Sequence, residues 1–96
     1  MSMTVMVTRN VSDRIRGFLA SSMLELAPGV YVAPGISPPV RARIWKVIEE
    51  WIDASSSAVM LWTDPSMPGG LASQVLGTPP IAIRDLDGML VAQRAL

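Results

Sequence analysis

The sequence contains no cysteine and no histidine, and it has a single lysine, Lys46. Without cysteine and histidine the chain can form neither a disulfide framework nor a zinc site with thiolate or imidazole ligands. Nucleophiles activated by an imidazole are excluded for the same reason. Any catalysis would therefore depend on carboxylates, hydroxyls, arginines or Lys46. The absence of cysteine is compatible with a reducing cytoplasm, where we expect the protein to reside.

Long apolar runs are also missing. The longest one, at residues 58–62, is far shorter than the ~18 residues that a membrane span needs. The first residues contain no basic segment followed by a long apolar stretch, so no targeting peptide is expected. The sequence therefore predicts a soluble protein with no membrane partner.

Charge is scarce and unevenly placed. Only 17% of the 96 residues are charged, whereas 50% are apolar. This composition is unusually apolar for a small domain and suggests that another subunit covers part of the apolar surface. Residues 1–46 carry six cations against two carboxylates, and residues 47–96 carry two cations against six carboxylates. Solvated faces and local ion pairs are the simpler explanation of this pattern by itself. The pI of about 6.1 argues against strong nucleic-acid binding by the chain alone.

The apolar pattern predicts two helices and a series of strands. Short runs rich in apolar and β-branched residues predict strands at 3–8, 58–63 and 71–76. Apolar residues recur at helical spacing over 12–22, after side chains at Asn10 and Ser12 that can cap a helix. A second helix begins at Ser37, with proline in its first turn, and ends before the serines at 55–57. Hairpins are predicted at 24–32 and 81–91, and the second closes on Asp87-Gly88.

This order of elements predicts an α+β fold, namely a ferredoxin-like βαββαβ sandwich with an additional C-terminal β-hairpin. We expect residues 1–78 to form the ferredoxin-like domain and residues 79–96 to form a C-terminal strand extension. The apolar arms of the extension cannot all be buried in so small a domain. We therefore expect them to join the sheet edge of another chain.

Arg14 and Arg16 lie in the first turns of the first predicted helix, on either side of Ile15. The positive end of the helix dipole disfavours cations at this place. An anion bound there would reverse the effect, because backbone N–H groups and both guanidiniums would face it. The alternative is that Asp13 and solvent offset the cost and the arginines only extend along the surface. These residues alone leave both interpretations open.

Carboxylates and tryptophans are the other candidates. Asp85 and Asp87 share one side of a strand and would be able to hold Mg²⁺, but a turn role explains Asp87-Gly88 better. Trp51 and Trp62 occupy apolar-pattern positions, which predicts core packing. Trp45 lies at the edge of the apolar stripe and is the one expected to reach an interface.

Five segments together resemble the small CRISPR-associated "Cas two" family of the type I-E subtype. They are MSMTVMVTRNVSDRIRG, PGVYVAPGIS, VRARIWKVIEEW, AVMLWT and IRDLDGMLV, in that order. The resemblance runs from Met1 to about Val91. It implies a ferredoxin-fold homodimer that sits between two dimers of the "Cas one" integrase. As the small subunit of this spacer-acquisition complex, it would bridge the integrase dimers and bind the backbone of the protospacer, a double-stranded DNA.

The resemblance also implies which residues make contacts. Arg14 and Arg16 match family positions that touch DNA phosphates, and Arg41 matches another basic position near the duplex. The segment from about Ile81 to Ala92 matches the part of the family that adds strands to the integrase. The expected nucleic-acid-binding residues are Arg14, Arg16, Arg41, Asn10 and Arg84. The expected partner-binding residues are Ile81, Ile83, Leu86, Met89, Leu90 and Val91.

Two departures from the family pattern bear on activity. Type I-E relatives carry a basic pair where this chain has Gly77-Thr78, and Arg84 is the candidate replacement. Many relatives outside the subtype have an aspartate at the end of the first strand, proposed to bind a divalent metal. Here that stretch is Thr8-Arg9-Asn10, and an arginine repels a cation.

We therefore expect a non-catalytic adaptor with no catalytic residue, no metal and no cofactor. The alternative is a Mg²⁺-dependent endonuclease of the same family, which would cut RNA or double-stranded DNA with Asp13, Asp85 or Asp87. A toxin-like ribonuclease is a weaker third option, because general acid–base cleavage without a metal lacks its usual histidine and lysine groups here.

Overall fold

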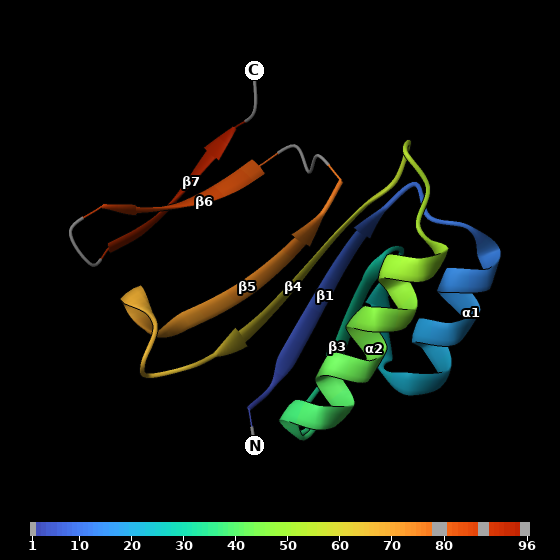
Figure 1. Ribbon diagram of the computed structural model, residues 1–96, viewed down its shortest axis with the longest axis horizontal. Helices are drawn as coiled ribbons and strands as arrows, with labels where there is room; N and C mark the ends of the chain where they lie inside the picture. The colour runs from blue at the N-terminus through green and yellow to red at the C-terminus, as the bar shows by residue number, and fades with distance from the viewer. Residues whose placement is uncertain (1, 78–80, 87–88, 95–96) are drawn as a thin grey trace.

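A computed structural model of the chain describes residues 2–77, 81–86 and 89–94, with side chains in the last two ranges only at 90–92. The described elements are seven strands, two α-helices and one short 3-10 turn (Figure 1). In chain order they are β1 (Thr4–Arg9), α1 (Asp13–Ser22), β2 (Leu24–Ala27), β3 (Val30–Ala33), α2 (Pro38–Trp51), β4 (Ser57–Thr63), the short 3-10 turn η1 (Pro68–Gly70), β5 (Leu71–Leu76), β6 (Ile81–Leu86) and β7 (Met89–Arg94).

The main sheet has five antiparallel strands in the order β2-β3-β1-β4-β5. The first four reproduce the ferredoxin-like arrangement, in which each helix connects strands that are not neighbours. Both helices lie on the same side of the sheet (Figure 1). The predicted ferredoxin-like α+β fold is therefore confirmed. Strand β5 extends the sheet beyond β4, and β6 and β7 form a separate two-stranded sheet.

The core lies between the helices and the covered face of the sheet. Alternate residues of a strand point to opposite faces, and Thr4, Met6 and Thr8 of β1 are the buried set. Tyr31 of β3 and Met60 of β4 join them, both fully buried. The helices contribute five buried side chains, which are Ile15, Leu19, Ile44, Trp45 and Ile48.

Serine side chains begin both helices, as predicted. The Ser12 hydroxyl accepts a hydrogen bond from the Ile15 amide at 3.3 Å, and the Ser37 hydroxyl accepts one from the Val40 amide at 3.4 Å. Such bonds satisfy amides that have no partner within the helix. Asn10 is not the cap, and its φ of 57° places it in the left-handed region. It forms a turn before α1 instead.

The central part of the sheet face opposite the helices is apolar, and its side chains are half-buried or exposed. In register, Val5 pairs with Val32 and Leu61, and Val7 pairs with Val30 and Val59. Val59 in turn pairs with Val75, whose relative exposure is 51%. We call this set, Val5, Val7, Val30, Val32, Val59, Leu61 and Val75, the apolar sheet face.

The C-terminal hairpin is confirmed, with Leu86 paired to Met89 and Ile81 paired to Arg94. Its predicted turn, Asp87-Gly88, lies outside the described residues. Leu90 packs so closely on η1 that a Cβ on Gly69 would lie 2.6 Å from the Leu90 Cγ. At the other end of β5, Gly77 has a φ of 74°, and a Cβ there would collide with the backbone carbonyl oxygen of Ser56.

Among the described residues, no helix combines the length and the apolar character needed to cross a bilayer.

Candidate nucleic-acid interface

The first turn of α1 sends its two arginines to opposite flanks. Ile15 is buried between them, and successive helical residues are about 100° apart, so Arg14 and Arg16 point about 200° away from each other. At the start of the helix the Ser12 hydroxyl already accepts a hydrogen bond from the Ile15 amide, and Asp13 places a negative charge beside it. The two guanidiniums therefore form two separate contact points rather than one shared site at the helix terminus.

Arg14 faces the end of α2. Its Cζ atom lies 3.6 Å from the ring centroid of Trp51, which is the geometry of a cation–π contact. Phe18 meets the same ring edge-on, with centroids 5.6 Å apart and an interplanar angle of 68°. Stacking uses the face of a guanidinium and leaves its five N–H donors, which lie in the plane, available to another acceptor. Arg14 is thus positioned without losing its capacity to bind a phosphate.

Arg16 faces β2 and carboxylates. Its Nη1 lies 3.7 Å from the Asp13 Oδ1, and the side chains are 52% and 101% exposed, respectively. An ion pair this exposed contributes little to stability. Glu25 and Arg16 also lie close to the hydroxyl of the buried Tyr31. That hydroxyl has no hydrogen bond of good geometry within the described part of the chain. Burial raises the pKa of Tyr31, the Glu25 carboxylate raises it further, and Arg16 opposes both.

Arg41 forms a second guanidinium–tryptophan contact at the other end of α2. Its Cζ lies 4.1 Å from the ring centroid of Trp62 on β4. Asp64 is nearby, and its pKa is lowered mainly by hydrogen bonds from the Ser66 hydroxyl and amide, with a smaller effect of the Arg41 charge. Arg41 and Trp51 are ten residues apart on α2, which corresponds to about 15 Å along the helix axis. The structure therefore brings Arg41 together with neither α1 arginine.

Asn10 is tied into the fold. Its side-chain amide donates to the Ser55 carbonyl oxygen at 3.1 Å and to the Ser55 hydroxyl at 3.3 Å. The Ser56 hydroxyl in turn donates to the Asn10 carbonyl oxygen. The side-chain amide of Asn10 is thus engaged within the chain, which gives this residue a structural position beside the predicted contacts. Arg84 has no described side chain, and the same holds for Ile81, Ile83, Leu86 and Met89. Leu90 and Val91 are half-buried.

The described carboxylates do not gather into a metal site. No group of three or more carboxylate side chains is close enough to hold an ion in the described ranges. Asp53 Oδ1 accepts hydrogen bonds from the Ser55 amide and from the Ser55 and Ser56 hydroxyls. These bonds lower the pKa of Asp53, the Ser55 hydroxyl most. The side chains of Asp85 and Asp87 lie outside the description.

Two features of this surface escaped the sequence interpretation. Trp45 is buried in the core and does not reach an interface, so that expectation was wrong. Trp51 and Trp62 pack against the core as predicted, but they are only half-buried and also receive the arginines. Arg9 borders a polar pocket with Asn10 and residues 54–57. Arg9 is a charged residue at the end of an otherwise apolar strand, and this position in the sequence was the signal that could have identified it.

One comparison with known proteins places this surface in context. The family model described as CRISPR-associated protein (Cas_Cas2CT1978) matches residues 3–91. The match spans the main sheet, both helices and most of the C-terminal hairpin. It therefore includes Arg14, Arg16, Arg41 and the tryptophans on which two of them stack.

Proposed function

Because the chain belongs to the Cas2 family of CRISPR-associated proteins, which implies a role in CRISPR adaptation, we propose that the protein is a non-catalytic adaptor of the type I-E subtype. It forms a homodimer, bridges two dimers of the "Cas one" integrase, and binds the backbone of the protospacer duplex during spacer acquisition in the cytoplasm.

The observation that carries the proposal is the presentation of the two α1 arginines. Arg14 and Arg16 are exposed on both flanks of α1, and Arg14 keeps all its in-plane donors free while stacked on Trp51. Guanidiniums bind phosphate oxygens bidentately, and such contacts do not depend on base sequence. Two pairs in a dimer, related by two-fold symmetry, form a symmetric track for a duplex.

The apolar sheet face supports the homodimer. Seven apolar side chains face away from the helices, and they include exposed Val7 and Val75. A contiguous apolar surface of this kind typically marks a protein interface. A second copy of the same face is a matched cover, because the two-fold axis pairs each residue with its equivalent. The C-terminal hairpin, residues 81–94, is then left to engage the integrase.

The balance of charge agrees with dependence on a partner. With eight cations and eight anions, the small subunit has no excess positive charge to hold a duplex by itself. We expect weak DNA binding by the dimer alone and stronger binding by the joint assembly. Because the contacts are to phosphates, affinity decreases steeply as salt increases.

The test compares two double variants in the assembly with the integrase. Arg14→Ala/Arg16→Ala removes the proposed contacts, and Arg43→Ala/Lys46→Ala removes two exposed cations of α2 as a charge-matched control. Fluorescence anisotropy with a labelled duplex at fixed salt is expected to show at least a tenfold loss for the first double variant, since each phosphate contact is charge-assisted. The control is expected to change affinity much less. Equal effects of the two variants would contradict the assignment.

The nuclease alternative is tested on the purified dimer. RNA and double-stranded DNA are incubated with the protein, with and without Mg²⁺, and the products are separated on denaturing gels. An adaptor leaves both intact. Metal-dependent cleavage that disappears in an Asp13→Asn variant would replace the adaptor with an endonuclease.

A further inference from the structure

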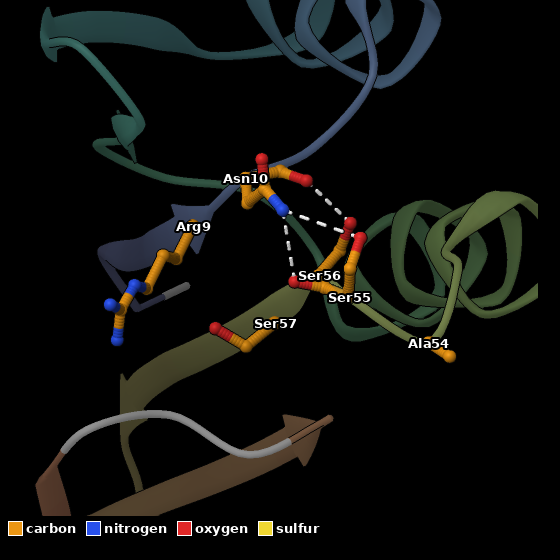
Figure 2. Close-up of a pocket in the computed structure, with 6 residues that line it drawn as sticks. All are labelled: Arg9, Asn10, Ala54, Ser55, Ser56 and Ser57. Atoms are coloured by element: carbon orange, nitrogen blue, oxygen red, sulfur yellow. Dashed lines mark hydrogen bonds between the residues drawn. The ribbon is translucent and has the colours of Figure 1, made fainter.

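We propose that the pocket between the end of β1 and the start of β4 is an oxyanion site that binds a phosphate of a nucleic-acid backbone. Its volume is about 530 Å³, and it is lined by Arg9, Asn10, Ala54, Ser55, Ser56 and Ser57 (Figure 2). The identification of the phosphate with nucleic acid rests on the proposed function. The oxyanion site itself does not.

The charge of the lining selects an anion. Arg9 is the only charged residue among the six that line the pocket, and it makes no ion pair with the described part of the chain. The nearest carboxylate on the same loop, Asp53, is not part of the lining. Its Oδ1 is occupied by three hydrogen bonds from the serines. A cation at this place would meet a guanidinium and no lining carboxylate, so an anion is the ligand that fits.

A second donor lies beside the guanidinium. Arg9 and Ser57 are direct partners in the β1–β4 pairing, so their side chains point to the same side of the sheet. Figure 2 shows both side chains directed to the same side of the pocket. The Ser57 hydroxyl donates to no described acceptor, although the residue is only 5% exposed. A guanidinium and a neighbouring hydroxyl match the acceptor geometry of a phosphate.

The opposite wall is rigid before any ligand arrives. Residues 55 and 56 are tied by hydrogen bonds to Asn10 and to Asp53, and the single Ser56 hydroxyl proton is shared between the Asn10 carbonyl oxygen and Asp53 Oδ1. Their hydroxyl protons are thereby used, and their oxygens present acceptors. A sugar or base hydrogen next to the bound phosphate would therefore find partners on this wall. A pocket that needs no ordering upon binding loses less affinity to conformational entropy. Its volume is in the range of small-molecule sites, so it holds a phosphate together with adjoining parts of a nucleotide.

The site is tested on the isolated full-length protein by NMR. Amide shifts are followed during titration with inorganic phosphate, against sodium chloride at equal ionic strength. The expected result is saturable shifts confined to residues 9, 10 and 54–57. Arg9→Gln is expected to weaken phosphate binding about tenfold, since it removes a charge-assisted contact, while the matched exposed variant Arg43→Gln leaves it unchanged. Absent shifts, or equal shifts around the other arginines, would overturn the site.

The source of the phosphate is tested by repeating the titration with a short DNA duplex and with a mononucleotide. Perturbation of the same amides by the duplex, lost in Arg9→Gln but kept in Arg14→Ala/Arg16→Ala, supports a backbone contact separate from α1. A response to phosphate and the mononucleotide, but not to the duplex, would overturn the nucleic-acid part and leave a small-phosphate site. The adaptor function fails independently, if the α1 double variant binds the duplex normally in the assembly.

Discussion

Arg14 and Arg16 leave the same turn of α1, and yet they are held by opposite kinds of chemistry. Arg14 lies over an aromatic ring, with its Cζ 3.6 Å from the Trp51 centroid. Arg16 points at a carboxylate, 3.7 Å from Asp13. The tryptophan contacts the face of the Arg14 guanidinium, whereas the Asp13 carboxylate lies near one of the Arg16 nitrogens that a phosphate would contact.

The Trp51 ring therefore positions Arg14, whereas Asp13 competes with a phosphate for Arg16. The Trp51 ring limits the rotamers of Arg14 and leaves its donors free, so binding a phosphate costs little ordering of the side chain. Arg16 must exchange one anion for another, and the exposed Asp13 repels a phosphate as well. Arg14 is therefore the stronger expected contact, although the two residues carry the same charge on the same turn.

Among the variants that test this comparison of Arg14 with Arg16, we expect Trp51→Ala to have the largest effect. The ring is half-buried, packs on the core and contacts Phe18, so we expect the free energy of unfolding to decrease by about 2 kcal/mol, less than for a fully buried tryptophan. Urea denaturation measures this loss. Trp51→Phe keeps an aromatic face and is expected to retain most of the stability and of the DNA affinity. If Trp51→Ala bound DNA in the assembly as the wild type does, the positioning role would be refuted.

The next effect is the difference between single arginine variants in the assembly with the integrase. We expect Arg14→Ala to weaken duplex binding by roughly five- to tenfold and Arg16→Ala by roughly two- to threefold, since only the latter contact replaces an existing ion pair. Anisotropy measured at several salt concentrations provides both numbers, and each variant lowers the salt slope by about one. A larger loss for Arg16→Ala would reverse the comparison.

Asp13→Asn is expected to act in the opposite direction. Removal of the competing carboxylate should tighten duplex binding about twofold, because a surface ion pair of this kind contributes well under 1 kcal/mol. The same change removes a favourable charge from the start of α1 and lowers stability by a few tenths of a kcal/mol. Glu50→Gln, an exposed carboxylate of α2, controls for the change in net charge. An Asp13→Asn variant that binds DNA more weakly would show that Asp13 orients Arg16 rather than competes for it.

The smallest expected effect is a change in the pKa of Tyr31, and it is specific to the side of α1 that carries Arg16. The chain has a single tyrosine, so absorbance near 295 nm reports Tyr31 alone during an alkaline titration. Burial and Glu25 raise the pKa of Tyr31 above its ordinary value of 10.0, and Arg16 opposes them. Arg16→Ala is therefore expected to raise the pKa of Tyr31 further, whereas Arg14→Ala leaves it unchanged. An equal change in the pKa of Tyr31 in both variants would mean that Arg16 is not closer to Tyr31 electrostatically than Arg14 is.

The sign of the linked stability follows from the same shift. Above pH 10.0 the unfolded chain releases the tyrosine proton before the folded chain does. The contribution of Tyr31 to stability is thus fully present below that pH and is lost as the pH rises through the folded-state pKa.

Local patterns were sufficient to predict the elements of the fold. The apolar spacing predicts the first helix at 12–22, and this helix spans Asp13–Ser22 with Ser12 as its cap. The β-branched run predicts the first strand at 3–8, and this strand spans Thr4–Arg9. Helical spacing, capping hydroxyls and β-branched runs are properties of neighbouring residues, and therefore they are readable in the chain without knowledge of its partners.

The tryptophans and the pocket depend on contacts that local patterns do not contain. Trp45 is buried because α2 covers the sheet with a wider face than its regular apolar stripe, and Trp51 is half-buried because α2 ends there. The stack of Arg14 on Trp51 joins residues 37 positions apart. Arg9 meets Ser57 across the β1–β4 pairing. Such pairs arise from the packing of elements, so the sequence pointed to the arginines but not to what holds them.

The conformation of Gly77 limits how this protein can be engineered. The type I-E relatives that this chain resembles carry a basic pair at the positions of Gly77 and Thr78, and here the first of these is a glycine with a φ of 74° pressed against the Ser56 carbonyl. An arginine grafted onto position 77 would strain the backbone and push on the loop that walls the Arg9 pocket. The absent cation is thus not a vacancy that one substitution can refill. Placing a cation at position 77 would therefore also require a different path of the chain past residue 56.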